Sequence, residues 1–199
     1  MAKERLKSPR ARLFVALDLP EEVRAGIESW AGPALADPAL RRVPRESLHI
    51  TLAFLGYRPE KEIERIAAAV EASAAPAPKV ELLDPVARPP RRVRLFALPA
   101  RSPGAEALQA DLRERLVAAR FYEAEKRAFW PHVTVARVRP EGRGSRRPAR
   151  VARFPEDLPA ALKRPFFCVR MTLYRSELQP SGARYVPLAQ VELSAGGRQ

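Results

Sequence analysis

A five-residue pattern occurs twice in this chain, and each copy begins with one of its only two histidines. Residues 49–53 read HITLA and residues 132–136 read HVTVA, so a β-branched residue separates histidine from threonine in both copies. The chain has only three threonines among its 199 residues. Composition alone would place a threonine two positions after both histidines with odds of about 2 in 10,000. The fold must therefore present the same two side chains twice, 83 positions apart.

The predicted elements around the two copies also repeat in order. Apolar runs bounded by proline or glycine predict strands, and apolar residues at helical spacing predict helices. We expect strands at residues 12–19, 48–55 (closed by Gly56), 80–87, 93–98, 132–138, 166–174 and 183–193. We expect helices at residues 21–30, 60–74 and 104–119, the last capped by Ser102 and Pro103. The final two strands are predicted to pair around the turn Pro180-Ser181-Gly182.

Each copy of the pattern lies in a predicted strand, where side chains alternate between two faces. Histidine and threonine therefore point to the same side. The apolar residues beside them are predicted to point into the core, namely Ile50, Leu52, Val133 and Val135. A pseudo-two-fold pairing of the two copies then puts one imidazole on either side of a single cleft.

Two imidazoles that face one cleft suit the in-line displacement of an oxygen at phosphorus. One histidine takes a proton from the attacking water and the other protonates the departing oxygen, since both titrate near the working pH. Thr51, Thr134 and Arg137 can hydrogen-bond the non-bridging phosphate oxygens. A single histidine on a polar strand face is more often an ordinary surface residue. Packing alone, however, does not require histidine and threonine at matching places in both halves.

Other chemistries fit the sequence less well. Zinc sites usually draw three or four ligands from histidine and cysteine, but the two histidines are far apart and Cys168 stands alone in an apolar strand. No G-x-S-x-G, G-x-x-x-x-G-K-[ST] or G-x-G-x-x-G motif occurs in the sequence. We therefore expect no metal site and no nucleotide cofactor.

The formal net charge of +13 favours an anionic partner. Thirty of the 36 basic residues are arginine, which suits bidentate phosphate recognition better than lysine. Compositional bias toward arginine, alanine and proline would produce the same excess of positive charge. The charge alone therefore does not establish an anionic partner, and a binding site must be identified. Residues 139–153 carry six arginines against one glutamate, and we expect this loop to contact the phosphates of a nucleic-acid partner through Arg143, Arg146, Arg147 and Arg150. The basic residues 1–12 read instead as a solvated terminus.

Length and composition indicate a globular protein, with 46% hydrophobic and 30% charged residues. No apolar run approaches the roughly 20 residues of a membrane-spanning helix, and no secretory signal is evident. A single cysteine agrees with a reducing compartment. We expect a cytoplasmic protein without a membrane partner.

Four stretches carry a family resemblance that covers nearly the whole chain. They are residues 12–16 (RLFVA), 48–56 (LHITLAFLG), 131–137 (PHVTVAR) and 173–185 (LYRSELQPSGARY). The paired H-x-T motifs resemble those of the two-histidine (2H) phosphoesterases. The FLG and PHxTxAR flanks resemble the LigT-type branch of RNA 2′,3′-cyclic phosphodiesterases, also called 2′-5′ RNA ligases.

The resemblance implies an α+β fold in which residues 1–199 form one bilobal domain. Two antiparallel sheets would line a central cleft, with helices outside. It also implies a monomer that hydrolyses RNA 2′,3′-cyclic phosphate ends, those of tRNA fragments among them, to 2′-phosphates without a metal or cofactor. Reversible 2′-5′ ligation would be the same chemistry run backwards.

The resemblance also implies the role of each site residue. His49 is the expected proton donor and His132 the proton acceptor, a distinction that the sequence symmetry alone does not give. Thr51, Thr134 and Arg137 would bind the phosphate, and Phe14 would contact RNA.

Two alternatives stay open at this point. The same site could act on a small cyclic phosphate such as ADP-ribose 1″,2″-cyclic phosphate, which the length of the productive substrate would reveal. The chain could also be a non-catalytic RNA-binding module, which a His49 variant that binds RNA without activity would exclude.

Overall fold

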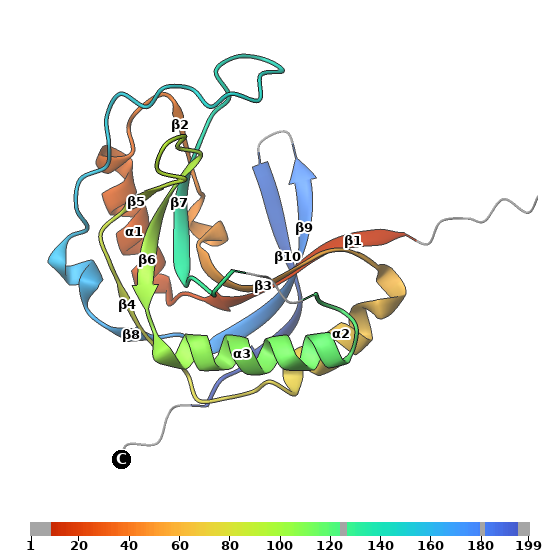
Figure 1. Ribbon diagram of the computed structural model, residues 1–199. Helices are drawn as coiled ribbons and strands as arrows, with labels where there is room; N and C mark the ends of the chain where they lie inside the picture. The colour runs from red at the N-terminus through yellow and green to blue at the C-terminus, as the bar shows by residue number, and fades with distance from the viewer. Residues whose placement is uncertain (1–8, 124–126, 180–181, 195–199) are drawn as a thin grey trace, which may run out of the picture.

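Antiparallel strands build the framework of the computed structural model, which describes residues 9–123, 127–179 and 182–194 (Figure 1). Hydrogen-bonded neighbours follow the order β10-β9-β1-β3-β7-β6-β4-β8, with β2 on β7 and β5 on β6. The strands are β1 (Arg10–Asp18), β2 (Leu40–Arg42), β3 (His49–Pro59), β4 (Lys79–Leu82), β5 (Val86–Arg88), β6 (Leu95–Arg101), β7 (His132–Val138), β8 (Phe166–Phe167), β9 (Arg170–Gln179) and β10 (Gly182–Glu192). The helices are α1 (Glu21–Ala34), α2 (Ile63–Glu71) and α3 (Pro103–Ala118), with short 3₁₀ turns at Arg45–Ser47, Glu60–Glu62 and Ala160–Lys163.

The strands form two halves that meet at β3 and β7. The register between these two strands consists of one pair, Ile50 with Val133. Strands β1, β9 and β10 continue the half that contains β3, whereas β2, β6, β5, β4 and β8 continue the half that contains β7. The predicted bilobal α+β fold is confirmed, and the structure adds that the two antiparallel halves join through this pair.

The helices α2 and α3 pack against each other, and α3 also packs against β3 and β4 (Figure 1). In α3, the Ser102 hydroxyl accepts a hydrogen bond from the Ala105 N–H at 3.1 Å and donates one to the Lys79 carbonyl at 2.7 Å. The predicted cap is therefore confirmed. The predicted helix 60–74 begins as a 3₁₀ turn and becomes α2 only from Ile63, with Ile66 and Val70 buried.

The helix α1 is longer than predicted. Its buried face continues past Trp30 through Ala31 and Ala34. Pro33 lies in the last turn, where the helix loses one backbone hydrogen bond but no longer needs to propagate. The prediction that this helix ends at residue 30 was wrong because its apolar spacing continues through Ala31 and Ala34.

Three predicted strand boundaries were also wrong. Gly56 does not close its strand, since β3 continues to Pro59. Gly56 instead has a positive φ of 67° and lies beside a register shift within the strand. The predicted strand 80–87 is two strands, β4 and β5, which pair with opposite ends of β6. The predicted strand 166–174 divides at Cys168 into β8 and β9.

The core contains the apolar residues of both motifs, as predicted. Ile50, Leu52, Val133 and Val135 are each at most 3% exposed. Cys168 is buried, and this burial raises the pKa of its thiol to about 12. Residues 1–8 of the basic terminus and 180–181 of the predicted turn lie outside the described residues. In the part of the chain that the structure describes, no helix is long and apolar enough to cross a membrane.

Candidate active site

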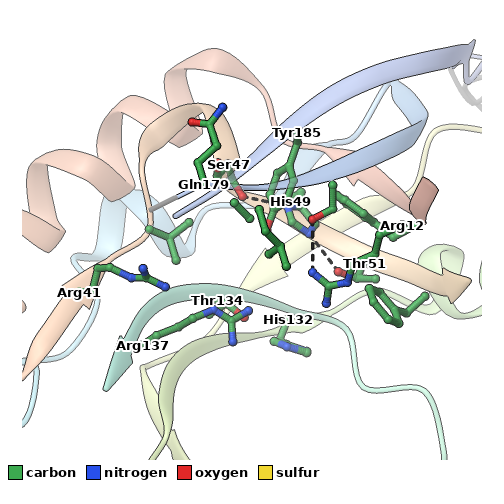
Figure 2. A pocket seen from close by; sticks show the side chains of 16 residues that line it. Arg12, Arg41, Ser47, His49, Thr51, His132, Thr134, Arg137, Gln179 and Tyr185 are labelled. Atoms are coloured by element: carbon green, nitrogen blue, oxygen red, sulfur yellow. Dashed lines mark hydrogen bonds between the residues drawn. The ribbon is translucent and has the colours of Figure 1, made fainter. Parts of the chain in front are cut away.

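A cavity of about 410 Å³ opens between β3 and β7 and collects the polar groups of both motifs (Figure 2). His49 and Thr51 enter it from β3, whereas His132, Thr134 and Arg137 enter it from β7. The structure therefore brings together all five residues for which the sequence predicted a catalytic or phosphate-binding role. We refer to this space as the active-site cavity.

The pairing of Ile50 with Val133 explains why the two motifs converge. In an antiparallel pair of this register, the residue before Ile50 lies across from the residue after Val133. His49 is therefore across from Thr134, and Thr51 is across from His132. The repeat in the sequence thus becomes an approximate two-fold arrangement in space.

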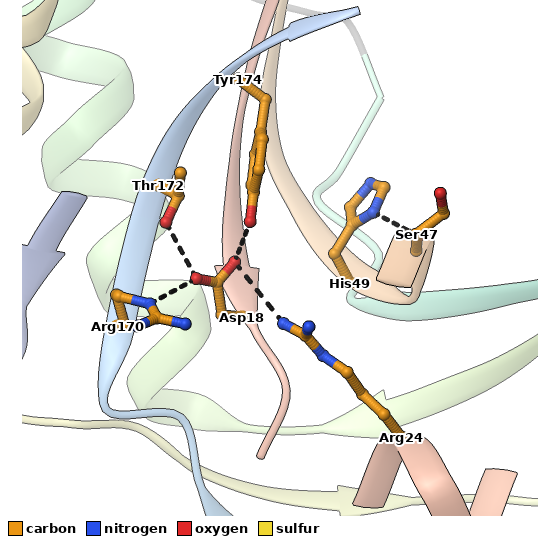
Figure 3. A network of polar contacts seen from close by, with 7 residues as sticks. All are labelled: Asp18, Arg24, Ser47, His49, Arg170, Thr172 and Tyr174. Carbon is orange, nitrogen blue, oxygen red and sulfur yellow. Dashed lines mark hydrogen bonds and ion pairs between the residues drawn. The ribbon is translucent and has the colours of Figure 1, made fainter. Parts of the chain in front are cut away.

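The His49 ring is fixed through both of its nitrogens. Its Nδ1 lies 2.8 Å from the Ser47 carbonyl oxygen, which can only accept, so Nδ1–H is the donor (Figure 3). Its Nε2 lies 3.0 Å from the Thr51 hydroxyl. In the neutral imidazole, Nε2 therefore carries the lone pair on the side of the cavity.

The His132 ring is held in the same way by its own half. Its Nδ1 donates to the carbonyl of Trp130 at 2.8 Å, again two residues before the histidine. The Trp130 ring stacks on the imidazole at a centroid distance of 4.1 Å and an angle of 19°. The Arg88 guanidinium lies 4.9 Å from the Trp130 ring centre, so the imidazole is backed by a cation–π pair.

In each strand, an extra residue directly after the motif threonine changes which face the later side chains occupy. The register of β7 against β6 skips Val135, and the register of β3 against β1 skips Leu52. Such a bulge reverses the alternation, because two successive residues lie on the same side of it. Arg137 and Phe54, each five residues after its histidine, therefore line the active-site cavity.

Arg12 is a cavity residue that the sequence analysis missed. Its guanidinium lies 4.6 Å from the Phe54 ring centre, and Nη1 donates to the Ser176 hydroxyl at 3.3 Å. Arg12 thus brings a positive charge to the half that contains β3, where Phe54 takes the position that Arg137 has in β7. The available signal was its position two residues before Phe14, which places both side chains on the same face of β1.

Aromatic rings form the wall behind His49. The Phe14 ring centre lies 5.0 Å from that of His49, 5.2 Å from that of Tyr174 and 4.8 Å from that of Tyr185. The Tyr185 ring also meets the His49 ring edge-on at 5.4 Å. Phe14 lines the cavity but is only 3% exposed, so its observed contacts are with these rings.

A buried carboxylate lies behind this wall (Figure 3). Asp18 is 4% exposed and accepts hydrogen bonds from Arg170 Nε at 2.7 Å, Thr172 Oγ1 at 2.9 Å and the Tyr174 hydroxyl at 2.7 Å. Because Tyr174 stacks on Phe14, the network supports the wall that holds His49. A lone aspartate in the apolar run of residues 12–19 was the signal that could have identified it.

Burial in the cavity disfavours the protonated form of both imidazoles. Burial lowers the pKa of His49 to about 4, and the positive charges of His132 and Arg137 also lower it, while the Ser47 carbonyl and Asp18 raise it. Burial likewise lowers the pKa of His132, with further lowering by Arg137 and Arg88. An anion in the cavity would offset these effects, since it stabilises the protonated forms.

The arginine-rich loop lies beyond the far end of β7 (Figure 1). The Glu141 N–H donates to the Arg147 carbonyl at 2.8 Å, and the Asp37 carboxylate accepts from the N–H groups of Ala152 and Arg153 at 2.8 and 2.9 Å. The four arginines predicted to contact RNA are all exposed and do not line the active-site cavity: Arg143, Arg146, Arg147 and Arg150.

The part of the chain that the structure describes contains no group of three or more histidine, cysteine, aspartate or glutamate residues that could hold a metal ion. The cavity instead presents hydroxyl and guanidinium donors beside two imidazoles. Such donors bind an anion, and the imidazoles can transfer protons to and from it.

Comparison with known proteins identifies relatives that cover nearly the whole chain. The model of the 2′-5′ RNA ligase superfamily matches residues 19–175. An RNA 2′,3′-cyclic phosphodiesterase of Thermus thermophilus is 32% identical over 191 residues, which covers 92% of this chain and 90% of the relative. A protein of Escherichia coli with the same name is 31% identical over 188 residues, which covers 92% of this chain and 97% of the relative.

The fold has similar counterparts among solved structures. The crystal structure of E. coli LigT complexed with NADP⁺ matches with a TM-score of 0.73 at 28% sequence identity. The match covers 94% of this chain and 99% of that one.

Proposed function

The chain belongs to the 2′-5′ RNA ligase superfamily, the group of 2H phosphoesterases that its paired motifs resemble, and from this we propose that it opens RNA 2′,3′-cyclic phosphate ends to 2′-phosphates. The observation that carries the proposal is the arrangement of His49 and His132 in one cavity with hydroxyl and guanidinium donors between them. Two relatives named RNA 2′,3′-cyclic phosphodiesterases support the choice of substrate. NADP⁺, which E. coli LigT binds, is a nucleotide with a 2′-phosphate, as the proposed product would be.

His132 acts as the general base in this proposal. Its Nδ1–H is committed to the Trp130 carbonyl, so the lone pair of Nε2 is available to take a proton from water. The water oxygen then forms a bond to phosphorus. The effects of Arg88 and Arg137 on the pKa of His132 favour its neutral form, which is the form that a base needs.

His49 acts as the general acid on the opposite side. The bond between phosphorus and O3′ breaks, and the proton on Nε2 of the His49 imidazolium passes to O3′, while the O2′ bond to phosphorus is retained. Asp18 favours the charged form of His49, and the anionic substrate adds to this effect. His132 then releases its proton to solvent and His49 takes one up, which restores the starting state.

Phosphate binding falls to the donors between the imidazoles. Thr51, Thr134 and Arg137 would hydrogen-bond the non-bridging oxygens, whose charge grows in the transition state. Phe14 would hold the His49 ring rather than contact RNA, since it is almost fully buried. Ligation would follow the same path in reverse, with an RNA 5′-hydroxyl in place of water.

The deciding experiment is incubation with an oligoribonucleotide that ends in a 2′,3′-cyclic phosphate, followed by ³¹P NMR of the product. We expect a 2′-phosphomonoester and no 3′-phosphomonoester. The variants His49→Ala and His132→Ala serve as controls for contaminating nucleases. A 3′-phosphate product, or turnover that survives both substitutions, would contradict the proposal.

A further inference from the structure

A second cavity of about 590 Å³ adjoins the active-site cavity. Its walls come from β2, from the 3₁₀ turn Arg45–Ser47 and from the facing ends of β9 and β10. The two cavities share Arg41, Arg137 and Tyr185 among their lining residues, so they lie side by side. We call the second one the arginine cavity, because Arg41, Arg42, Arg137 and Arg184 line it.

The positive charge of the arginine cavity is not neutralised. Its four arginines are exposed, and none of them forms an ion pair with any residue that the structure describes. The nearby Arg45, by contrast, is paired with Glu21 and Glu28. Glu46 is the one acidic residue that lines this cavity among the residues described. Four unpaired guanidiniums around one opening create a strong site for an anion.

The opposite exit from the active site is much less cationic. A cavity of about 560 Å³ lies beyond Phe54 and is lined by two arginines, Arg58 and Arg120. Arg58 is paired with Glu62 at 2.7 Å, and Glu123 adds a negative charge beside Arg120. Both cavities adjoin the active-site cavity, so an RNA whose cyclic end occupies it could extend toward either one. Charge complementarity favours the arginine cavity.

We propose that the arginine cavity binds the RNA backbone immediately upstream of the cyclic end, starting with the 5′-phosphate of the terminal nucleotide. Arg42 and Arg184 contact this backbone from opposite walls, one on β2 and one on β10. Val43, Pro44 and the Tyr185 ring supply apolar surface for the attached nucleoside. The proposal rests on the proposed function and identifies RNA, rather than a small cyclic phosphate, as the substrate.

The test compares two substrates in one double variant. Arg42→Ala/Arg184→Ala alters residues that line the arginine cavity but not the active-site cavity. We expect KM for a trinucleotide ending in 2′,3′-cyclic phosphate to rise at least about tenfold. The slope of log KM against log salt should fall by about 0.7 for each RNA phosphate that the variant no longer neutralises. Cytidine 2′,3′-cyclic phosphate, which has no 5′-phosphate, should be hydrolysed at an unchanged rate.

The matched control is Arg91→Ala/Arg164→Ala, which removes the same charge from exposed positions away from both cavities. This control should leave both substrates unaffected. Glu46→Gln should have the opposite effect and lower KM for the trinucleotide, which a damaged fold would not do. An equal loss on both substrates, or no loss on the trinucleotide, would overturn the proposal.

Failure of the proposed function would look different, because the unaltered protein would then open neither substrate. Fluorescence anisotropy of a labelled trinucleotide ending in 2′-phosphate would in that case still measure whether the arginine cavity binds RNA. Binding at least about tenfold weaker in Arg42→Ala/Arg184→Ala than in the control variant would support the inference. Equal binding by the two variants would overturn it.

Discussion

Phe54 occupies in β3 the position that Arg137 occupies in β7, five residues after the histidine and beyond a one-residue bulge. The halves differ in how they supply positive charge at this position. In the half that contains β7, Arg137 belongs to the motif strand itself. In the other half, Arg12 comes from β1 and stacks on Phe54 at 4.6 Å. Each half therefore brings a guanidinium to the active-site cavity next to its motif, and Arg41 on β2 adds a third to the half that contains β7.

We predict that both guanidiniums stabilise the phosphate in the transition state. Arg137→Ala should lower kcat about 10² to 10³-fold, as is typical when one preorganised donor is removed. Arg12→Ala should also lower kcat. Arg10→Ala, on the same strand but outside the active-site cavity, should leave kcat unchanged and is the matched control. Steady-state kinetics on the trinucleotide give these values, and a change confined to KM would assign both arginines to ground-state binding instead.

The predicted part of the site and the missed part differ for a physical reason. His49, Thr51, His132 and Thr134 follow from strand alternation and an internal repeat, which a sequence displays directly. Arg137 was also predicted to bind phosphate, but strand alternation did not support that prediction: its place in the cavity depends on the bulge at Val135, since regular alternation would have pointed it into the core. Bulges depend on the partner strand, so the motif alone could not reveal them.

The residues contributed by other strands were missed for a related reason. Arg12 approaches Phe54, and Asp18 reaches Tyr174, through pairings that join distant parts of the chain. In the fold, most strands and helices were predicted correctly, whereas errors arose where one apolar run serves two partners. The predicted strand 80–87 is an example, because β4 and β5 pair with different ends of β6.

We predict that the two histidines act as one unit. His49→Ala and His132→Ala should each lower kcat/KM about 10² to 10⁴-fold, the usual contribution of general acid or base catalysis. The double variant should be little worse than either single variant, because removal of one partner already stops proton transfer. Activity assays with all three variants measure the coupling. Losses that multiply in the double variant would show that the histidines act independently.

The lowered pKa values predict an unusual pH profile. Catalysis needs one proton shared between His49 and His132, and burial lowers the pKa of His49 to about 4 and that of His132 below its usual value of 6.5. The kcat/KM of the free enzyme should therefore peak below about pH 6.5 and fall as the pH rises, because both imidazoles then lose their protons.

The bound phosphate changes this profile in a defined direction. Its negative charge raises both pKa values, so the kcat profile should lie at higher pH than the kcat/KM profile. The limbs of each curve belong to the coupled pair rather than to one histidine. Rates measured from about pH 4 to about pH 9, which brackets the ordinary histidine pKa, provide the comparison. Coincident profiles would show that substrate binding does not alter protonation of the histidines.

Removal of metal ions should not change the rate. The imidazoles supply the proton transfers, and the threonine and arginine donors supply the charge stabilisation that a divalent cation would otherwise provide. The measurement is hydrolysis of the trinucleotide before and after dialysis against EDTA. A loss of activity that one added metal restores would require a different mechanism, with carboxylates as ligands.

The arginine-rich loop should affect only long RNA. Replacement of Arg143, Arg146, Arg147 and Arg150 by alanine should raise KM for a long oligonucleotide and leave kcat unchanged, because these side chains lie outside the active-site cavity. The slope of log KM against log salt should fall by about 0.7 for each phosphate that the loop no longer neutralises. Cytidine 2′,3′-cyclic phosphate should be hydrolysed equally by both proteins.

The salt series on substrates of increasing length separates this loop from the arginine cavity. The arginine cavity lies beside the active site and should act on RNA as short as a trinucleotide, whereas the loop needs a chain long enough to reach beyond the end of β7. The quadruple variant should therefore behave like the unaltered protein on the trinucleotide and differ from it only as the RNA lengthens. An unchanged salt slope on long RNA would mean that the loop does not bind the chain, and compositional bias would then explain its charge.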